Sequence, residues 1–184
     1  MIASRSLKTP TKKCKAGSCS VEKCDCTTAT IKTSKGDIKI ELNPEKAPNT
    51  VKNFLYYIQE GQYTDTIFHR VISNFMIQGG EFLESGDQKK PSREPIKSEA
   101  NNGLRNERGS VAMARTNDPD SAKAQFFINV RNNGFLNYGI SKPGYTVFGK
   151  VTEGMDVVDE IKNGKTKRSD WPEQPVVIKE ITLS

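Results

Sequence analysis

The apolar residues of this chain occur in short alternating runs separated by turn-forming residues, and this pattern constrains its fold more than any other feature. Residues 30–33 and 38–42 alternate between apolar and polar side chains, and residues 34–37 between them are typical of a turn. The two runs therefore predict a β-hairpin with its apolar side chains on one face. Other short runs rich in strand-forming residues predict strands at 66–72, 75–82, 109–115, 125–130, 145–151 and 175–183.

Two segments have helical rather than strand periodicity, and the first lies near residue 50. Its apolar residues recur at intervals of three and four and predict one buried stripe on a helix of about three turns. These residues are Val51, Phe54, Leu55 and Ile58. We expect Asn49 or Thr50 to cap the start of this helix and Gly61 to mark its end.

The second helical segment follows residue 152. Thr152 is the expected N-cap, Glu153 lies in the expected first turn, and residues 163–164 end the helix. The residues expected to face inward are Met155, Val157, Val158 and Ile161. Many short strands with only two helices predict a barrel or a sandwich, and periodicity alone does not choose between the two.

The chain is expected to form one domain over residues 29–184, preceded by a flexible basic tail over residues 1–28. A length of 184 residues suits one domain with a sizeable core. The tail has six basic and two acidic residues, a net charge of +4, which leaves only +2 of the total +6 for the body. Because the body has no basic stripe, we expect no nucleic-acid binding. No run approaches the roughly 18 apolar residues of a membrane span, so we expect a soluble protein without membrane contact.

All four cysteines lie in the tail, at Cys14, Cys19, Cys24 and Cys26. The body therefore has no disulfide framework, and the spacing does not match paired zinc-binding cysteines. We favour a flexible tail with reduced thiols. The alternative is a thiolate tail that handles metal or redox chemistry, with the domain as its passenger. The tail lacks the apolar segment of a secretory signal. We therefore expect a cytoplasmic protein, or an organellar one if the tail is a transit peptide.

Four blocks of the body resemble the signatures of the cyclophilin family, in the family's order and spacing. The first block, at 68–82, reads FHRVISNFMIQGGEF. The second comprises 109–115, GSVAMAR, and 124–128, AQFFI; the third is FLN at 135–137; and the fourth is VFGKV at 147–151. The resemblance covers the chain from residue 30 to the C-terminus. One block alone would be weak evidence, but four in register argue strongly against chance similarity.

The resemblance implies a mainly β fold, a closed eight-stranded antiparallel β-barrel capped by two α-helices. It also implies a peptidyl-prolyl cis/trans isomerase that acts on proline-containing peptides and unfolded chains and assists protein folding, without cofactor or metal. We expect a monomer. The residues expected to act in catalysis are Arg70, Phe75 and Gln78. Those expected to bind the substrate are Met76, Ala114, Arg115, Thr116, Gln125, Phe127, Phe135, Leu136 and Tyr145.

Several of these positions differ from the best-known eukaryotic cyclophilins and resemble the bacterial type. Phe135 stands where the eukaryotic members carry a tryptophan that contacts cyclosporin, and Tyr145 stands where they carry a histidine. Arg115 and Thr116 replace an asparagine and an alanine. Because Arg70 is retained, catalysis is expected, whereas cyclosporin binding is expected to be weak or absent.

The chemistry of the peptide bond explains why an arginine beside apolar residues suits this reaction. The bond resists rotation with a barrier of about 18–20 kcal/mol, because its nitrogen shares a lone pair with the carbonyl. In the twisted bond the prolyl nitrogen regains that lone pair, and Arg70 can donate a hydrogen bond to it. While the preceding residue rotates, the residues expected to hold the proline ring are Phe75, Met76, Phe127 and Leu136.

Two other interpretations bear on the site. His69 is the only histidine of the chain and would face away from Arg70 if both lie in a strand, so we expect it to be structural. A binding module that captures proline-containing segments without turnover is the main alternative function. The retained Arg70 favours an enzyme, because holding a proline ring does not require it.

Overall fold

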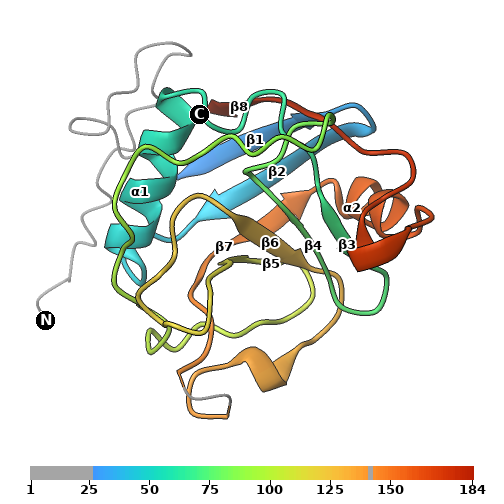
Figure 1. Cartoon of the computed structure of the whole chain (residues 1–184). Helices are drawn as coiled ribbons and strands as arrows, with labels where there is room; N and C mark the ends of the chain where they lie inside the picture. Colours follow the sequence, from blue (N-terminus) through green and yellow to red (C-terminus); the bar gives the residue numbers. More distant parts are fainter. Residues whose placement is uncertain (1–26, 141–142) are drawn as a thin grey trace, which may run out of the picture.

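The computed structural model describes residues 27–140 and 143–184. The chain forms β1 (Thr28–Thr33), β2 (Gly36–Leu42), α1 (Pro48–Gln59), β3 (Arg70–Ile72), β4 (Met76–Gly79), β5 (Ser110–Met113), β6 (Phe126–Asn129), η1 (Gly134–Leu136), β7 (Val147–Glu153), α2 (Met155–Lys162), η2 (Arg168–Asp170) and β8 (Ile178–Leu183) (Figure 1). No helix among the described residues is long and apolar enough to cross a membrane. The predictions of a flexible tail and of its four cysteines concern residues 1–26, which lie outside this part of the chain.

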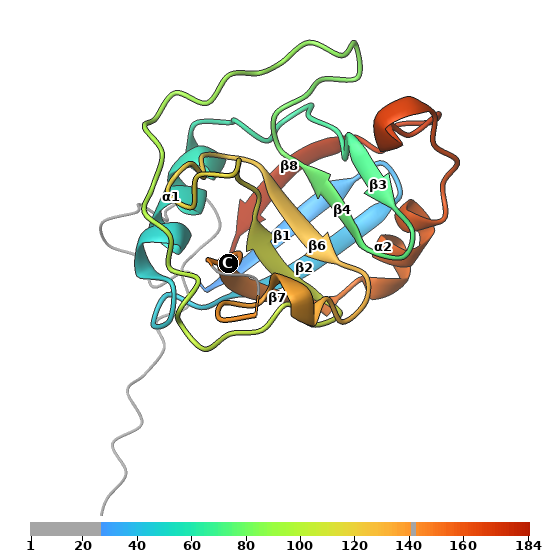
Figure 2. The ribbon, with the colours of Figure 1, turned by 60° about the horizontal axis from the view of Figure 1, so that its bottom comes forward.

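All eight strands belong to one sheet, in the order β3-β4-β6-β5-β7-β2-β1-β8. Every neighbouring pair is antiparallel, and the predicted hairpin is confirmed by the pairing of β1 with β2. The two edge strands of the sheet, β3 and β8, do not pair with each other. The sheet is therefore an open, strongly curled half-barrel (Figure 2). The predicted closed barrel is therefore wrong.

The sheet stays open because its edge strand β3 is short. The predicted strand at 66–72 shrinks to Arg70–Ile72, and the segment before it makes only isolated bridges, such as Ile67 with Val177. The turn η2 contacts β3. The edges are thus linked locally without a continuous ladder of hydrogen bonds.

The two helices lie at opposite ends of the curled sheet, and each buries the predicted apolar stripe (Figure 1). Phe54 of α1 is fully buried, and its ring lies 5.1–5.7 Å from the ring centroids of Tyr63, Phe126 and Phe148. Helix α2 packs against β2, β3 and β4 and buries Val158. Aromatic burial of this kind supplies much of the apolar area that stabilises the fold.

The start of α1 is capped by a residue from a distant loop. The N-cap position is Ala47, which makes no side-chain hydrogen bond. The Glu99 carboxylate instead accepts hydrogen bonds from the backbone N–H and the hydroxyl of Thr50, both at 2.7 Å. The predicted capping by Asn49 or Thr50 is therefore wrong. A carboxylate satisfies the free N–H groups and also complements the positive end of the helix dipole.

The start of α2 also differs from the prediction. Strand β7 continues through Thr152 and Glu153, and the N-cap is Gly154 at φ +95°. A side chain on Gly154 would overlap the carbonyl oxygen of Asp37, so both the backbone angle and the close approach require glycine here. The predicted cap, Thr152, donates its hydroxyl to the carbonyl of Lys39 at 3.3 Å instead.

We expect Glu99→Ala to lower the free energy of unfolding by about 1–2 kcal/mol, because it removes both a cap and a charge at a helix N-terminus. Urea unfolding followed by circular dichroism measures the change. Glu94→Ala is the matched control, because Glu94 is an exposed carboxylate of the same loop. Equal stability of the two variants would contradict a capping role for Glu99.

Candidate active site

The three neighbouring strands β4, β6 and β5 carry buried side chains on both faces. Along β6, Phe126 and Ile128 enter the main core, whereas Phe127 between them belongs to a second apolar cluster on the outer face. The strand pairing places Phe127 opposite Gln78 of β4 and Ala112 of β5. Because side chains alternate across a strand, these three residues share the outer face. The buried members of the second cluster are Met76, Ala112, Phe127, Leu136 and Val147.

A pocket of about 330 Å³ opens above this second cluster. Its lining consists of Arg70, Phe75, Met76, Gln78, Ala114, Arg115, Phe127, Phe135, Leu136 and Tyr145. The other two predicted site residues, Thr116 and Gln125, line a second cavity that shares Gln78, Ala114 and Arg115 with the first. The structure thus brings all twelve predicted site residues together on one face, although they come from separate parts of the chain.

Aromatic rings and aliphatic side chains line the pocket together. Met76, Phe127 and Leu136 are its buried members. The ring of Phe75 stacks on that of Phe135 with centroids 5.6 Å apart, and Phe127 meets Tyr145 edge-on at 5.8 Å. Phe135 keeps 56% of its surface exposed, so it forms the rim rather than the floor. The result is a shallow apolar cup suited to a small ring.

Arg70 lies at one side of this cup, on the edge strand β3. Its side chain is exposed, and no carboxylate of residues 27–140 or 143–184 forms an ion pair with it. It lies directly opposite Gln78 in the β3–β4 pairing. The guanidinium donors of Arg70 are therefore available to a bound molecule.

Arg115 is held very differently. Its Nε and Nη2 donate to the carbonyl of Gly144 at 3.1 and 2.6 Å, and its Nη1 donates to the carbonyl of Thr116 at 2.8 Å. The guanidinium also lies 4.2 Å from the ring centroid of Tyr145. These contacts show that the Arg115 side chain fixes the loops around the pocket.

A chain of side-chain hydrogen bonds runs from Gln78 away from the pocket. Gln78 Nε2 donates to Gln125 Oε1 at 2.7 Å, and Gln125 Nε2 donates to Glu81 Oε2 at 2.9 Å. Glu81 is buried and was not among the residues predicted from the sequence. The available signal was its place as the only charged residue in the apolar run 75–82.

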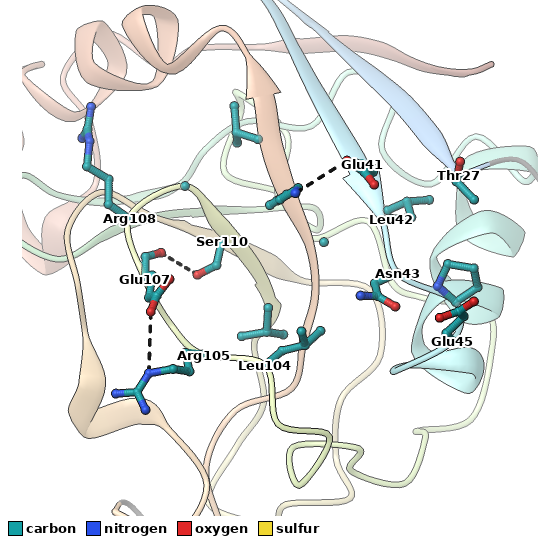
Figure 3. Close-up of a pocket in the computed structure, with 16 residues that line it drawn as sticks. Thr27, Glu41, Leu42, Asn43, Glu45, Leu104, Arg105, Glu107, Arg108 and Ser110 are labelled. Carbon is teal, nitrogen blue, oxygen red and sulfur yellow. Dashed lines mark hydrogen bonds and ion pairs between the residues drawn. The ribbon is translucent and has the colours of Figure 1, made fainter.

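A larger cavity, of about 580 Å³, lies elsewhere, over β2, β5 and β7 (Figure 3). None of the twelve predicted site residues lines it. Six charged residues line it, and four of them form two ion pairs, Lys150 with Glu41 at 3.8 Å and Arg105 with Glu107 at 3.6 Å. This cavity therefore offers a less suitable place than the apolar cup for a proline ring.

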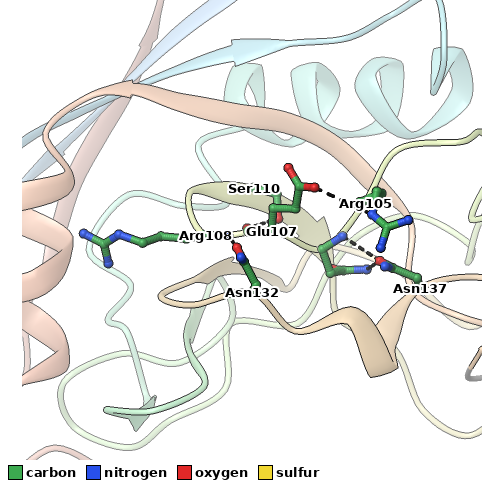
Figure 4. A network of polar contacts seen from close by, with 7 residues as sticks. Arg105, Glu107, Arg108, Ser110, Asn132 and Asn137 are labelled. Carbon is green, nitrogen blue, oxygen red and sulfur yellow. Dashed lines mark hydrogen bonds and ion pairs between the residues drawn. The ribbon is translucent and has the colours of Figure 1, made fainter.

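A network of asparagine side chains, part of it buried and part exposed, lies beside the pocket. The backbone N–H of Asn106 donates to Asn137 Oδ1 at 2.7 Å, and that of Arg108 donates to Asn132 Oδ1 at 2.9 Å (Figure 4). Asn133 Nδ2 donates to the carbonyl of Phe75 at 2.8 Å. Asn133 thus ties the Phe75 segment to η1, which follows it directly, and Asn137 at the other end of η1 holds the Asn106 backbone.

His69 lies outside the pocket. Its ring packs 4.6 Å from that of Phe82 and 6.2 Å from that of Trp171. Burial lowers the pKa of His69 to about 4, and the positive charge of Arg70 adds to the shift.

No group of three or more potential metal ligands occurs in the described parts of the chain.

The fold and the pocket define a mainly β protein whose outer face can bind a short apolar segment of a peptide beside a free arginine. The family model for "Cyclophilin type peptidyl-prolyl cis-trans isomerase/CLD" matches residues 28–183. The chain is 58% identical over 158 residues to peptidyl-prolyl cis-trans isomerase cyp18 of Streptomyces antibioticus, covering 82% of this chain and 95% of that protein. It is 56% identical over 162 residues to peptidyl-prolyl cis-trans isomerase B of Escherichia coli K12, covering 84% and 98%.

Solved structures agree with these matches. A cyclophilin type peptidyl-prolyl cis-trans isomerase of Cryptosporidium parvum, crystallised in the presence of the dipeptide Ala-Pro, superposes with a TM-score of 0.73 at 29% identity. The match covers 85% of this chain and 98% of that one. The chain therefore belongs to the cyclophilin-type peptidyl-prolyl cis-trans isomerases, and the predicted family and isomerase function are confirmed.

The depressed pKa of His69 predicts a specific loss of stability in mild acid. The unfolded chain, with an ordinary histidine pKa near 6.5, binds a proton that the folded chain does not bind until about pH 4. The free energy of unfolding should therefore fall as the pH drops below 6.5, by at most about 3 kcal/mol at pH 4.

Urea unfolding at a series of pH values tests this expectation. Between about pH 6.5 and 5 the carboxylates titrate little, because ordinary values for Glu and Asp are near 4.3 and 3.9. His69→Gln should flatten the dependence in that window, since the chain has no other histidine. The same slope in wild type and variant would contradict the buried neutral state of His69.

Proposed function

We propose that the apolar cup on the outer face is the active site and that Arg70 is its catalytic residue. The observation that carries this proposal is that Arg70, which forms no ion pair with the described residues, lines a pocket of about 330 Å³ together with the apolar side chains of Met76, Phe127 and Leu136. A binding module that only holds a proline ring would need the pocket but not Arg70. The available hydrogen-bond donors of Arg70 therefore favour an enzyme that isomerises the bond.

Arg70 acts on the transition state. As the Xaa-Pro bond twists, the prolyl nitrogen loses resonance and regains its lone pair, which the guanidinium can bind as a hydrogen-bond donor. This bond is weak or absent in the planar ground states, so it lowers the barrier rather than stabilising both isomers equally. A preorganised donor of this kind contributes a factor of about 10²–10³ in rate.

The pocket fixes one side of the rotating bond. Met76 and Leu136 form the base on which the proline ring rests, and Phe127 forms a wall. The residue before proline is then free to rotate in the open part of the groove, beside Gln78. No nucleophile, metal or cofactor takes part, because no covalent bond is made or broken.

The substrates we propose are proline-containing peptides and flexible or unfolded chains. The cup is shallow and open, and the Cryptosporidium parvum structure was determined in the presence of a dipeptide ending in proline. The exposed rim residue Phe135 offers a smaller ring than the tryptophan of the best-known eukaryotic cyclophilins. We therefore keep the prediction that cyclosporin binds weakly or not at all. The monomeric state and the cytoplasmic location also stay predictions.

Arg70→Ala should reduce the rate of cis/trans exchange in a short Xaa-Pro peptide by about 10²-fold or more, the effect of one lost transition-state donor. Exchange spectroscopy by NMR measures the rate with substoichiometric protein. Arg131→Ala is the matched control, because Arg131 is an exposed arginine outside the pocket. If wild type binds the peptide without accelerating exchange, the chain is a capture module. If Arg70→Ala keeps full activity, the site lies elsewhere.

A further inference from the structure

Glu81 is a buried carboxylate without a cationic partner. It follows β4 and keeps only 6% of its surface exposed. Among the described residues no lysine, arginine or histidine forms an ion pair with it. Its Oε2 accepts hydrogen bonds from Gln125 Nε2 at 2.9 Å and from Gln88 Nε2 at 3.0 Å. Because a buried charge is unfavourable unless it is hydrogen-bonded, these two amides are tied to Glu81.

The carboxylate determines which way the neighbouring amides point. An ionised carboxylate only accepts hydrogen bonds, whereas an amide side chain has one accepting and one donating end. Gln125 must therefore turn its NH₂ group toward Glu81, which leaves its oxygen toward Gln78. Gln78 in turn donates its NH₂ group to Gln125 Oε1 at 2.7 Å. In the chain Glu81–Gln125–Gln78, each glutamine therefore donates its NH₂ group toward Glu81, and the opposite orientation is excluded.

This direction leaves the oxygen of Gln78 free as an acceptor, because only the NH₂ group is used in the bond to Gln125. Gln78 lies directly opposite Arg70 in the antiparallel pairing of β3 and β4, on the same face of the sheet. Side chains in such pairs lie within reach of each other, with Cβ atoms about 5 Å apart. A guanidinium only donates hydrogen bonds, so an oxygen beside it is complementary and an NH₂ group would be repelled.

We propose that Glu81 is a positioning residue for the isomerase reaction. It sets the direction of the hydrogen-bond chain, so that Gln78 presents an oxygen to Arg70 and holds the guanidinium over the pocket. Glu81 does not line the pocket that contains Arg70, but it lines the adjoining second cavity with Gln78 and Gln125. The inference rests on the proposed catalytic role of Arg70 and extends it to Glu81, which lies two hydrogen bonds from Gln78.

The substitution Glu81→Gln keeps the size of the side chain but replaces a group that only accepts hydrogen bonds with one that can also donate them. A glutamine can donate to Gln125 as well as accept from it, so both directions of the chain become accessible. We expect the turnover rate for an Xaa-Pro peptide to fall about tenfold with little change in KM, comparable to losing one hydrogen bond to a charged group. Glu84→Gln is the matched control, because Glu84 is an exposed carboxylate three residues away.

A swap of the two residues provides the rescue. In Glu81→Gln/Gln125→Glu the carboxylate at position 125 accepts from both neighbours, so Gln78 again turns its NH₂ group away from Arg70. We expect this double variant to regain most of the rate lost by Glu81→Gln. It also retains one buried carboxylate, so it keeps the proposal testable if Glu81→Gln folds poorly. A swap no more active than the single variant would overturn the proposal.

A double-mutant cycle with Arg70→Ala separates positioning from general damage. If Glu81 acts through Arg70, Glu81→Gln should have no further effect on exchange in the Arg70→Ala background. An equal loss in both backgrounds would overturn the positioning role. Full activity of Arg70→Ala would instead refute the proposed active site, whereas an impaired Arg70→Ala beside an unimpaired Glu81→Gln would refute only the role of Glu81.

Discussion

The structure depends on one constraint, the alternation of side chains across β4, β5 and β6. Each of these strands places one set of side chains in the main core and the next set in the outer cluster, as Phe126 and Phe127 show. Slipping any strand by one residue would exchange the two sets and destroy both the core and the pocket. The core that stabilises the half-barrel therefore also fixes the floor of the active site.

The open edge of the sheet keeps the Arg70 side chain accessible. Arg70 lies on β3, the edge strand, where its side chain stays exposed while the opposite strand supplies Gln78. The rigid, buried part of the site holds a ring, and the exposed part presents donors to a bond that must rotate. Beside both, Asn133 and Glu81 hold residues of the site through hydrogen bonds to the Phe75 carbonyl and to Gln125.

Periodicity predicted the elements whose packing is local, and it failed where distant residues decide the structure. The first hairpin and the apolar stripes of both helices follow from spacing, whereas the cap of α1 comes from Glu99, 49 residues beyond Thr50. Strand spacing left barrel and sandwich open, and the closed barrel that the resemblance implied was wrong because β3 and β8, at the two ends of the sheet, do not pair as strands. The resemblance to the cyclophilins supplied the pocket residues. It did not supply Glu81, whose importance depends on a hydrogen bond to Gln125 across the sheet.

The central claim is that a proline-containing peptide binds in the outer cup and not in the larger cavity over β2, β5 and β7. Titration of the ¹⁵N-labelled protein with an Ala-Pro peptide, followed by backbone amide shifts, tests this claim most directly. The account predicts the largest shifts at Arg70, Gln78, Phe127 and Leu136, with little change at 104–109. Shifts concentrated at 104–109 and along β7, with none around the cup, would contradict it.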